Sequence, residues 1–243
     1  LERLQRALVR INPQQKNGIA KYMGTSHKII GVGTLTQQQL AKTIYDLNIN
    51  EQDLLGIMDL AFKKSNIYEV KNAALLLAEY NFKKTDKKQL YKTMLPWVNY
   101  VDNWGHSDTL SKLYTRFLEM DDHQKPFLNQ LQKWNKNTNL WLRRQSMVSL
   151  LYYARTKNQH LPFKTIISLV STQLHAQEYY VQKGLGWTLR ETYNVYPVLT
   201  YKFVLNNFSR ISPVAFTAAV EKMTAKEKGI LKQKRKDHRY KNK

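Results

Sequence analysis

Trp104 and Asp108 are a pair of residues that could act on a positive charge. They lie four residues apart, so a helix that begins at or before Trp104 places both on one face. A carboxylate beside an aromatic ring can stabilise a developing cation, or orient a water molecule that attacks one. The alternative is structural, because Ser107 and Asp108 are residue types that suit the N-terminal turn of a helix.

A second candidate cluster combines two cations with an aromatic ring. Lys183, Trp187 and Arg190 have the spacing i, i+4 and i+7, which places them on one helical face. Such a face suits contact with phosphate and packing against a sugar or a base. The alternative is a tryptophan in the core, with two long cationic side chains that reach solvent around it.

Arg143 and Arg144 are adjacent and diverge by about 100° on a helix. One of them can therefore point into a groove while the other reaches its edge. The alternative is a solvated pair on an exposed face, which is the more common arrangement of two arginines.

The charge of the chain indicates a polyanionic partner. The 243 residues include 39 Lys and Arg against 18 Asp and Glu, a formal net charge of +21. Residues 226–243 carry nine of these cations and two carboxylates, or +7, so 21 − 7 leaves +14 on the rest of the chain. A charge of this size repels itself, and a polyanion relieves that repulsion. Nucleic acid is the first expectation and an anionic membrane surface the second.

Several classes of function are excluded or disfavoured by composition. The absence of cysteine excludes disulfides, thiolate nucleophiles and cysteine-based zinc sites, and is consistent with a cytoplasmic protein. No two histidines lie three to five residues apart, so we expect no helical metal pair, no metal and no cofactor. The glycines of Gly31-Val32-Gly33 are not followed by the Gly-Lys-Ser/Thr of a phosphate loop. No apolar run approaches the ~18 residues of a membrane helix, and we expect no membrane partner.

The elements that must position these residues are predicted to be helices. Apolar residues recur at three-to-four spacing along most of the chain, and strand-like alternation is nearly absent. Helix starts are indicated by residue types that cap a helix N-terminus, at Thr36, Asn50, Asp86 and Ser212. The sequence therefore predicts about a dozen helices and an all-α fold.

Four of the predicted helical segments form a repeat. Residues 70–77, 107–114, 142–149 and 181–188 superimpose with steps of 37, 35 and 39 residues, close to the period of a HEAT-type repeat. The intervening helices fall in the gaps, at residues 86–100, 123–136 and 163–176. We therefore predict a HEAT-like helical-repeat solenoid, an α-α superhelix whose second helices line a concave basic groove. The alternative is a chance spacing in an all-helical protein.

The predicted organisation is a single repeat domain over residues 1–225, followed by a basic C-terminal tail over residues 226–243. The tail is expected either to bind DNA weakly or to be disordered.

Several motifs together resemble the bacterial AlkD-like DNA alkylation repair glycosylases. They cover roughly residues 15 to 222. The most specific is the Gly-Trp-x-Leu-Arg-Glu element, and the Trp-Leu-Arg-Arg helix is next. The matching segments are Gln182–Glu191, Trp141–Arg144, Ser209–Pro213, Tyr22-Met23 and Gly31.

The resemblance implies a HEAT-like fold and a monofunctional hydrolase without a cofactor. Members of the family excise cationic N3- and N7-alkylated purines, such as 3-methyladenine and 7-methylguanine, without a base-flipping pocket. The implied partner is double-stranded DNA that contains such lesions. We expect a monomer in the bacterial cytoplasm, associated with the nucleoid when bound. One alternative is a non-catalytic binder of damaged or branched DNA on the same scaffold. Another is a protein-binding HEAT scaffold, which the charge of +14 outside the tail disfavours.

The resemblance also implies a role for particular residues. Asp108 looks like the catalytic carboxylate, and Trp104 and Trp187 look like the aromatic residues that cradle the deoxyribose of the lesion. Arg144 looks like the arginine that holds the backbone phosphate, and Tyr22 like an N-terminal DNA contact. Further expected contacts with nucleic acid are Arg143, Lys183 and Arg190.

The sequence departs from the family pattern at two places. The residue after Trp104 is usually acidic, and here it is Gly105, followed by His106. The N-terminal turn usually reads Thr-Pro, whereas here Thr34 is followed by Leu35. The four positions with catalytic roles all match, which favours an active enzyme.

Overall fold

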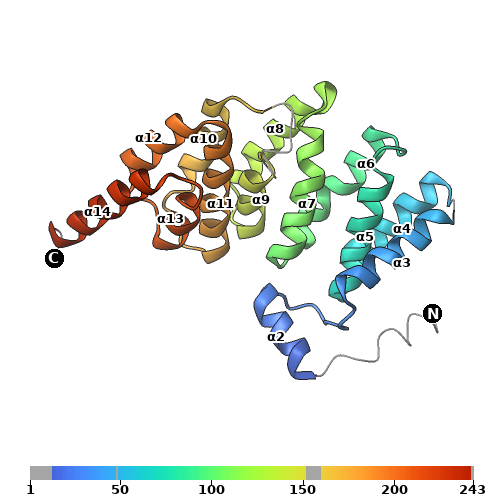
Figure 1. Cartoon of the computed structure of the whole chain (residues 1–243). Helices are drawn as coiled ribbons and strands as arrows, with labels where there is room; N and C mark the ends of the chain where they lie inside the picture. The colour runs from blue at the N-terminus through green and yellow to red at the C-terminus, as the bar shows by residue number, and fades with distance from the viewer. Residues whose placement is uncertain (1–12, 48, 152–159, 242–243) are drawn as a thin grey trace. The chain divides into compact units, whose positions relative to one another are not determined.

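The structure is a computed structural model that describes residues 13–47, 49–151 and 160–241. In these ranges the chain is helical with short connecting loops, and its β structure is limited to an isolated bridge between Lys28 and Ile67 (Figure 1). The all-α prediction is therefore confirmed. None of the helices in these ranges has the length and apolar character that crossing a membrane requires.

The chain divides into two compact units, residues 1–113 and residues 114–243, with the boundary inside helix α7. The prediction of one domain over residues 1–225 stays a prediction. The helices that precede the boundary, together with α7, are α2 (Pro13–Met23), α3 (Thr34–Asp46), α4 (Glu51–Lys64), α5 (Tyr68–Asn81), α6 (Lys87–Met94), the 3-10 helix η1 (Leu95–Tyr100) and α7 (Trp104–Phe117). Those of the second unit are α8 (Asp121–Asn135), α9 (Leu140–Val148), α10 (Phe163–Thr172), α11 (Tyr179–Val195), α12 (Pro197–Asn207), α13 (Pro213–Ala219) and α14 (Ala225–Lys241).

The first unit is built around α5, which packs against both α3 and α4. Phe62 of α4 and Trp97 of η1 are fully buried and stack with ring centroids 4.7 Å apart. Trp97 is thus part of the core of the first unit, and Trp134 and Trp141 are likewise buried in the second unit.

Lys71, a buried cation of α5, holds the C-terminal end of η1, the helix that precedes α7. Lys71 of α5 is 2% exposed, and its Nζ donates hydrogen bonds to the carbonyl oxygens of Phe62 (2.5 Å) and Tyr100 (3.2 Å). Burial lowers the pKa of Lys71, and Asp102 partly opposes this effect. The ends of α4 and η1 are thus attached to α5, and η1 ends four residues before α7 begins.

The second unit is built around α11, which packs against α9, α10, α12 and α13. Gly186 allows the closest of these approaches. A Cβ atom at this position would lie 2.3 Å from the carbonyl oxygen of Ala215 and 2.8 Å from its Cα, so only glycine fits between α11 and α13.

The predicted helix starts are confirmed at three positions out of four. The side chains of Asn50, Asp86 and Ser212 accept hydrogen bonds from backbone amides in the first turns of α4, α6 and α13. The start predicted at Thr36 is wrong, because α3 already begins at Thr34. Gly33 precedes it in an extended conformation and makes no side-chain cap, so no capping side chain marks the true start.

The segments assigned to the repeat are helical. Residues 70–77, 107–114 and 181–188 lie inside α5, α7 and α11, and α9 contains residues 142–148 of the fourth segment. In the second unit α9 packs against α11, as neighbouring second helices of a repeat are expected to do. The solenoid form and the concave basic groove stay predictions.

The predicted C-terminal tail begins with a helix rather than an irregular segment. A capping box starts α14, because Thr224 Oγ1 accepts from the Glu227 amide (3.2 Å) while a Glu227 carboxylate oxygen accepts from the Thr224 amide (2.9 Å). Leu231 of α14 is fully buried. The last two residues of the tail lie outside the described part of the chain.

Candidate active site

Trp104 and Asp108 lie on one face of α7, one turn apart. The helix begins at Trp104, and Asn103 caps it by accepting a hydrogen bond from the His106 amide at Oδ1 (2.8 Å). The first turn of α7 contains no acidic residue, so Asp108 lies in the second turn. The alternative explanation of Asp108 as a helix-start residue is therefore wrong. Both Trp104 and Asp108 are partly exposed.

Trp104 is held by the N-terminal helix. Its indole Nε1 donates a hydrogen bond to the carbonyl oxygen of Tyr22 (2.9 Å), and the two rings meet edge to face with centroids 5.4 Å apart. The Tyr22 side chain is 72% exposed. The structure thus brings together the expected DNA-contacting tyrosine and one of the expected aromatic walls.

The departure at Gly105 has a local physical reason. A Cβ atom there would lie 2.6 Å from Cε of Met23 and 2.8 Å from the hydroxyl of Tyr68. These side chains fill the space that a larger residue at position 105 would need.

Asp102 joins the loop after α2 to the start of α7. Its carboxylate accepts hydrogen bonds from Thr25 Oγ1 (2.9 Å to each oxygen), the Ser26 amide (2.7 Å), Ser26 Oγ (2.9 Å) and Asn103 Nδ2 (2.8 Å). Burial raises the pKa of Asp102, but these hydrogen bonds outweigh burial and the net pKa is lowered. Asp102 carries no signal in the sequence, because its partners lie 76 and 77 residues away along the chain.

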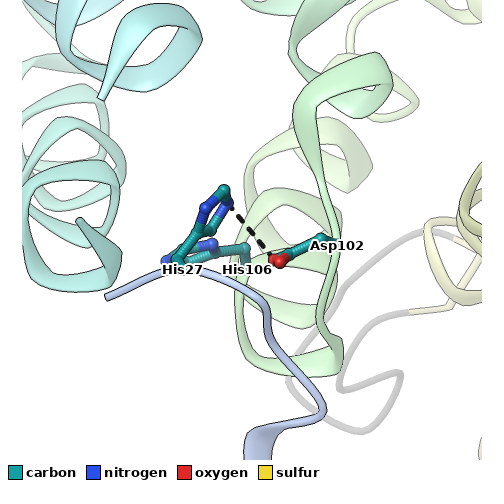
Figure 2. A group of neighbouring side chains, drawn as sticks. All are labelled: His27, Asp102 and His106. Carbon is teal, nitrogen blue, oxygen red and sulfur yellow. Dashed lines mark ion pairs between the residues drawn. The ribbon is translucent and has the colours of Figure 1, made fainter. Parts of the chain in front are cut away.

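Asp102 also lies beside two histidines, and together these side chains are of the types that bind metal ions (Figure 2). Ligand atoms of His27, Asp102 and His106 all lie within 4.8 Å of one another. Hydrogen bonds already occupy the His106 ring, since Nε2 contacts the Tyr68 carbonyl oxygen (3.1 Å) and Nδ1 contacts Asn103 Nδ2 (2.8 Å). A carbonyl oxygen only accepts, so Nε2 carries the proton and Nδ1 accepts. This arrangement serves as a hydrogen-bonded support for α7 rather than as an open metal site.

Both histidines are neutral at pH 7. Burial lowers the pKa of His106 to about 3, against a smaller opposing effect of the hydrogen bond to Tyr68. Burial also lowers the pKa of His27, although Asp102, whose Oδ1 lies 3.3 Å from His27 Nε2, opposes this effect. The contact between His27 and Asp102 therefore joins a neutral ring to a carboxylate.

The low pKa of His106 predicts that the first unit loses stability in mild acid. The unfolded state binds a proton at His106 below pH ~6.5 and the folded state does not, so the free energy of unfolding falls as the pH falls. This group alone contributes a loss of about 2 kcal/mol between pH 7 and pH 5. The measurement is urea denaturation of the wild type and of His106→Gln at both pH values. A smaller loss is expected for the variant, and an equal loss in both proteins would contradict the assignment.

Arg144 is a buried residue of α9 that is positioned by α11. It is 4% exposed, and its guanidinium donates a hydrogen bond to the carbonyl oxygen of Tyr180 (2.9 Å). Gly184 provides the space for it, because a Cβ atom there would lie 3.1 Å from Cγ and 3.2 Å from a terminal nitrogen of Arg144. The first glycine of the Gly-Leu-Gly-Trp motif thus accommodates an arginine that belongs to a different helix.

The other cations of the second unit that the sequence singled out each contact a carboxylate or an aromatic ring. Arg143 forms an ion pair with Glu178, so the alternative of a solvated arginine pair is wrong. Lys183, on α11, differs from Arg143 in its exposure and in the kind of group that it contacts. Lys183 is exposed and lies 6.0 Å from the ring centroid of Tyr179. The hydrogen bond from Arg143 is the main cause that lowers the pKa of Glu178.

Trp187 and Arg190 lie together on α11. The guanidinium carbon of Arg190 is 5.7 Å from the ring centroid of Trp187, and its nitrogens pair with Glu191 (3.0 Å) and Glu221 (3.0 Å). Trp187 is partly exposed, so the alternative of a tryptophan buried in the core does not describe it.

The predicted residues are distributed over both units. Tyr22, Trp104 and Asp108 belong to the first unit. The second unit contains Arg143, Arg144, Lys183, Trp187 and Arg190. Within each unit the structure places tryptophan beside another predicted residue, Tyr22 for Trp104 and Arg190 for Trp187.

Three solved structures are similar to this chain in fold. A protein described as a predicted DNA alkylation repair enzyme from Enterococcus faecalis matches with a TM-score of 0.72 at 17% identity, over 89% of this chain and 98% of its own. AlkD2 from Streptococcus mutans matches with a TM-score of 0.56 at 22% identity, over 87% of this chain and 99% of its own. The protein smu.31 from Streptococcus mutans UA159 matches with a TM-score of 0.55 at 23% identity, over 77% of this chain and 92% of its own.

No curated protein matches the amino-acid sequence of this chain. The model of one family, described as DNA alkylation repair enzyme, matches residues 4–223, which is nearly the whole chain. This chain, with its tryptophan and aspartate one turn apart on α7, belongs to the DNA alkylation repair enzyme family.

Proposed function

We propose that this protein is a DNA glycosylase that hydrolyses the N-glycosidic bond of cationic N3- and N7-alkylated purines in duplex DNA. The observation that carries the proposal is the pair of Trp104 and Asp108 on one face of α7, partly exposed in a chain with a net charge of +21. A carboxylate repels the phosphates of DNA, so its presence on a surface that binds DNA requires a functional explanation. Membership of a DNA alkylation repair family supplies the lesion as its target.

The lesion itself determines which groups the enzyme requires. Alkylation at N3 or N7 places a positive charge on the purine, and the base leaves as a neutral molecule when the bond between C1′ and N9 breaks. The electron pair of that bond moves to the base, so no side chain has to protonate it. Neither a general acid nor a cofactor or metal ion is part of the proposal.

The sugar that remains resembles an oxocarbenium ion, and its charge requires an anion and electron-rich surfaces. Asp108 stabilises this cation and takes a proton from the water molecule that forms the new bond to C1′. Trp104 and Trp187 contribute aromatic faces, an interaction related to cation–π attraction. Preorganised groups of this kind contribute about 3 kcal/mol each in other enzymes.

The cations hold the duplex largely without reading sequence. Arg144 is assigned a backbone phosphate at the lesion, and Tyr22, Arg143, Lys183 and Arg190 are assigned further contacts with DNA. The protein is proposed to act as a monomer in the cytoplasm, on DNA of the nucleoid.

Replacing Arg144 by alanine is expected to weaken duplex binding. One lost phosphate contact lowers the slope of log affinity against log salt concentration by about 1. Fluorescence anisotropy with a labelled duplex at several salt concentrations measures this slope. Lys133→Ala, which removes an exposed cation of α8, is the control. An unchanged slope for Arg144→Ala would remove this residue from the phosphate contacts.

The decisive experiment for the function separates cleavage from binding. Alkylated duplex DNA that contains 3-methyladenine and 7-methylguanine is incubated with the protein, and the free bases are then quantified. Heating with alkali cleaves the DNA at the abasic sites and provides a second readout. Release of both bases supports the glycosylase. Tight binding to alkylated duplex without base release would contradict it and would favour the non-catalytic binder.

A further inference from the structure

A second basic feature lies at the C-terminal end of the second unit, and its cations lie beyond residues 4–223, which match the family. Helices α13 and α14 enclose an open pocket of about 440 Å³. Figure 1 shows α14 at the end of this unit, past α12 and α13. The family match ends at residue 223, and α14 begins at Ala225. The residues that line the pocket include four cations and two aromatic residues, Lys232, Arg235, Lys236, Arg239, Phe216 and Tyr240.

The four cations share one face of α14. Their positions are i, i+3, i+4 and i+7, which places them in a stripe about 10 Å long. Lys232, Lys236 and Arg239 are exposed. Arg235 is more buried and has a structural role, since it donates hydrogen bonds to the carbonyl oxygens of Phe208 (2.6 Å) and Ile211 (2.8 Å).

The helix that carries this stripe is firmly attached to the second unit. Leu231 is fully buried, and the guanidinium carbon of Arg235 lies 4.3 Å from the ring centroid of Phe216 in α13. At the start of α14, the hydroxyl of Tyr193 donates a hydrogen bond to the carboxylate of Glu227 (2.7 Å). The stripe is therefore presented by a docked helix rather than by a free tail.

The lining of the pocket, as far as the structure describes it, carries no compensating negative charge. Among the described residues that line the pocket, none is acidic. The two carboxylates of α14 are engaged elsewhere, because Glu227 accepts from Tyr193 and Thr224, and Asp237 accepts from Gln233 (2.7 Å). Burial, and then the positive charge of Arg239, lower the pKa of Arg235. The cations repel one another, and an anion in the pocket would relieve this repulsion.

We propose that the pocket between α13 and α14 binds phosphodiester groups of the DNA backbone, through Lys232, Lys236 and Arg239. It is a DNA contact in addition to those assigned by family resemblance, and it rests on the proposed function. Phosphate contacts of this kind position a duplex and strengthen its binding without reading its sequence. A membrane surface is disfavoured, because α14 buries Leu231 in the protein and has no continuous apolar face to insert into lipid.

The test compares two variants of the full chain from which the same charge has been removed. The test variant is Lys232→Gln/Lys236→Gln/Arg239→Gln, which leaves the structural Arg235 in place. The control is Lys125→Gln/Lys133→Gln/Lys136→Gln, which removes three exposed cations of α8 and its C-terminal cap. Binding of an undamaged labelled duplex is measured over a range of salt concentrations. Circular dichroism and thermal melting verify that both variants are folded.

The proposal predicts that the salt slope of the α14 variant is lower than that of the wild type by about 2 to 3, and its affinity at least about tenfold weaker at 0.1 M salt. The control slope should change by less than about 1. Equal slopes in the two variants would overturn the proposal. A folding defect is separated from lost phosphate contacts by Lys232→Arg/Lys236→Arg, which should retain the wild-type slope.

Two further measurements distinguish the phosphates of DNA from a free phosphate compound and from a lipid headgroup. Inorganic phosphate at constant ionic strength should weaken duplex binding no more than chloride does, and selective competition would indicate a site for a free phosphate compound instead. Vesicles with phosphatidylserine should not bind through α14. Vesicle binding that is lost in the α14 variant while its DNA slope is unchanged would overturn the proposal.

The comparison of salt slopes does not depend on whether Asp108 is catalytic. Base release is therefore measured separately, on the wild type alone. If the wild type releases no base, the proposed function fails while the salt slopes still decide whether α14 binds DNA. If the slopes are equal and base is released, the glycosylase stands without this contact.

Discussion

Replacing Asp108 by asparagine is expected to lower the rate of base release at least about 100-fold. The amide has nearly the same shape as the carboxylate, but it has no negative charge to stabilise the sugar and cannot take the proton of the attacking water. Duplex affinity should be unchanged or higher, because the variant removes a group that repels phosphate. A loss of rate with retained binding assigns Asp108 to the transition state rather than to the docking of DNA.

This prediction is measured in single-turnover reactions, with the variant in excess over a duplex that contains one 7-methylguanine. Asp122→Asn is the matched control, since it makes the same change at an exposed residue of α8. The control should release the base at the wild-type rate. If Asp108→Asn does so as well, Asp108 is not the catalytic carboxylate.

Replacing Gly186 by alanine is expected to destabilise the second unit by about 2 kcal/mol or more. Alanine favours a helix over glycine by up to about 1 kcal/mol, so propensity alone predicts a gain. The added Cβ atom, however, would lie 2.3 Å from a backbone oxygen and 2.8 Å from the Cα of Ala215. Because these are backbone atoms, no side-chain rotation relieves the overlap, and α11 and α13 must move apart.

The destabilisation is measured by thermal melting, where a loss of this size lowers the melting temperature by about 4–8 °C. Gly229→Ala is the control, because a Cβ atom in this position of α14 has no neighbour within 4 Å. This control should leave stability unchanged or raise it. Equal melting temperatures for Gly186→Ala and the wild type would mean that the close approach of α11 and α13 is not required.

The features that could be predicted from the sequence are those governed by neighbours along the chain. The spacing of Trp104 and Asp108 predicted a shared helical face, and α7 begins where that required. Capping residue types predicted the starts at Asn50, Asp86 and Ser212. Where a helix starts without a capping side chain, as after Gly33, the local signal is absent, and the cap predicted at Thr36 is displaced by three residues.

The features that could not be predicted depend on residues distant in the sequence. Asp102 accepts hydrogen bonds from Thr25 and Ser26, and nothing in the spacing of these residues indicates that they meet. The same holds for Glu69, whose carboxylate accepts the amides of Ile30, Gly31 and Val32 and so fixes the loop before α3. Gly31 is required there because its φ is 98°, a conformation that other residues rarely adopt.

These distant contacts supply the support that the candidate site needs. Asp102 and the indole of Trp104 both fasten the segment around Tyr22 to the start of α7. The side chains with chemical roles could thus be proposed from residue types and spacing, whereas the contacts that hold them required the fold.

In the proposed reaction, a carboxylate stabilises a sugar from which a positively charged base departs, without protonation of that base. This reaction is tested most directly by single-turnover release of free base from two matched duplexes, one with a single 7-methylguanine and one with a single hypoxanthine. The first lesion is cationic and the second is neutral. We expect release of 7-methylguanine and no release of hypoxanthine above the uncatalysed rate. Release of hypoxanthine at a comparable rate, or of neither base, would contradict it.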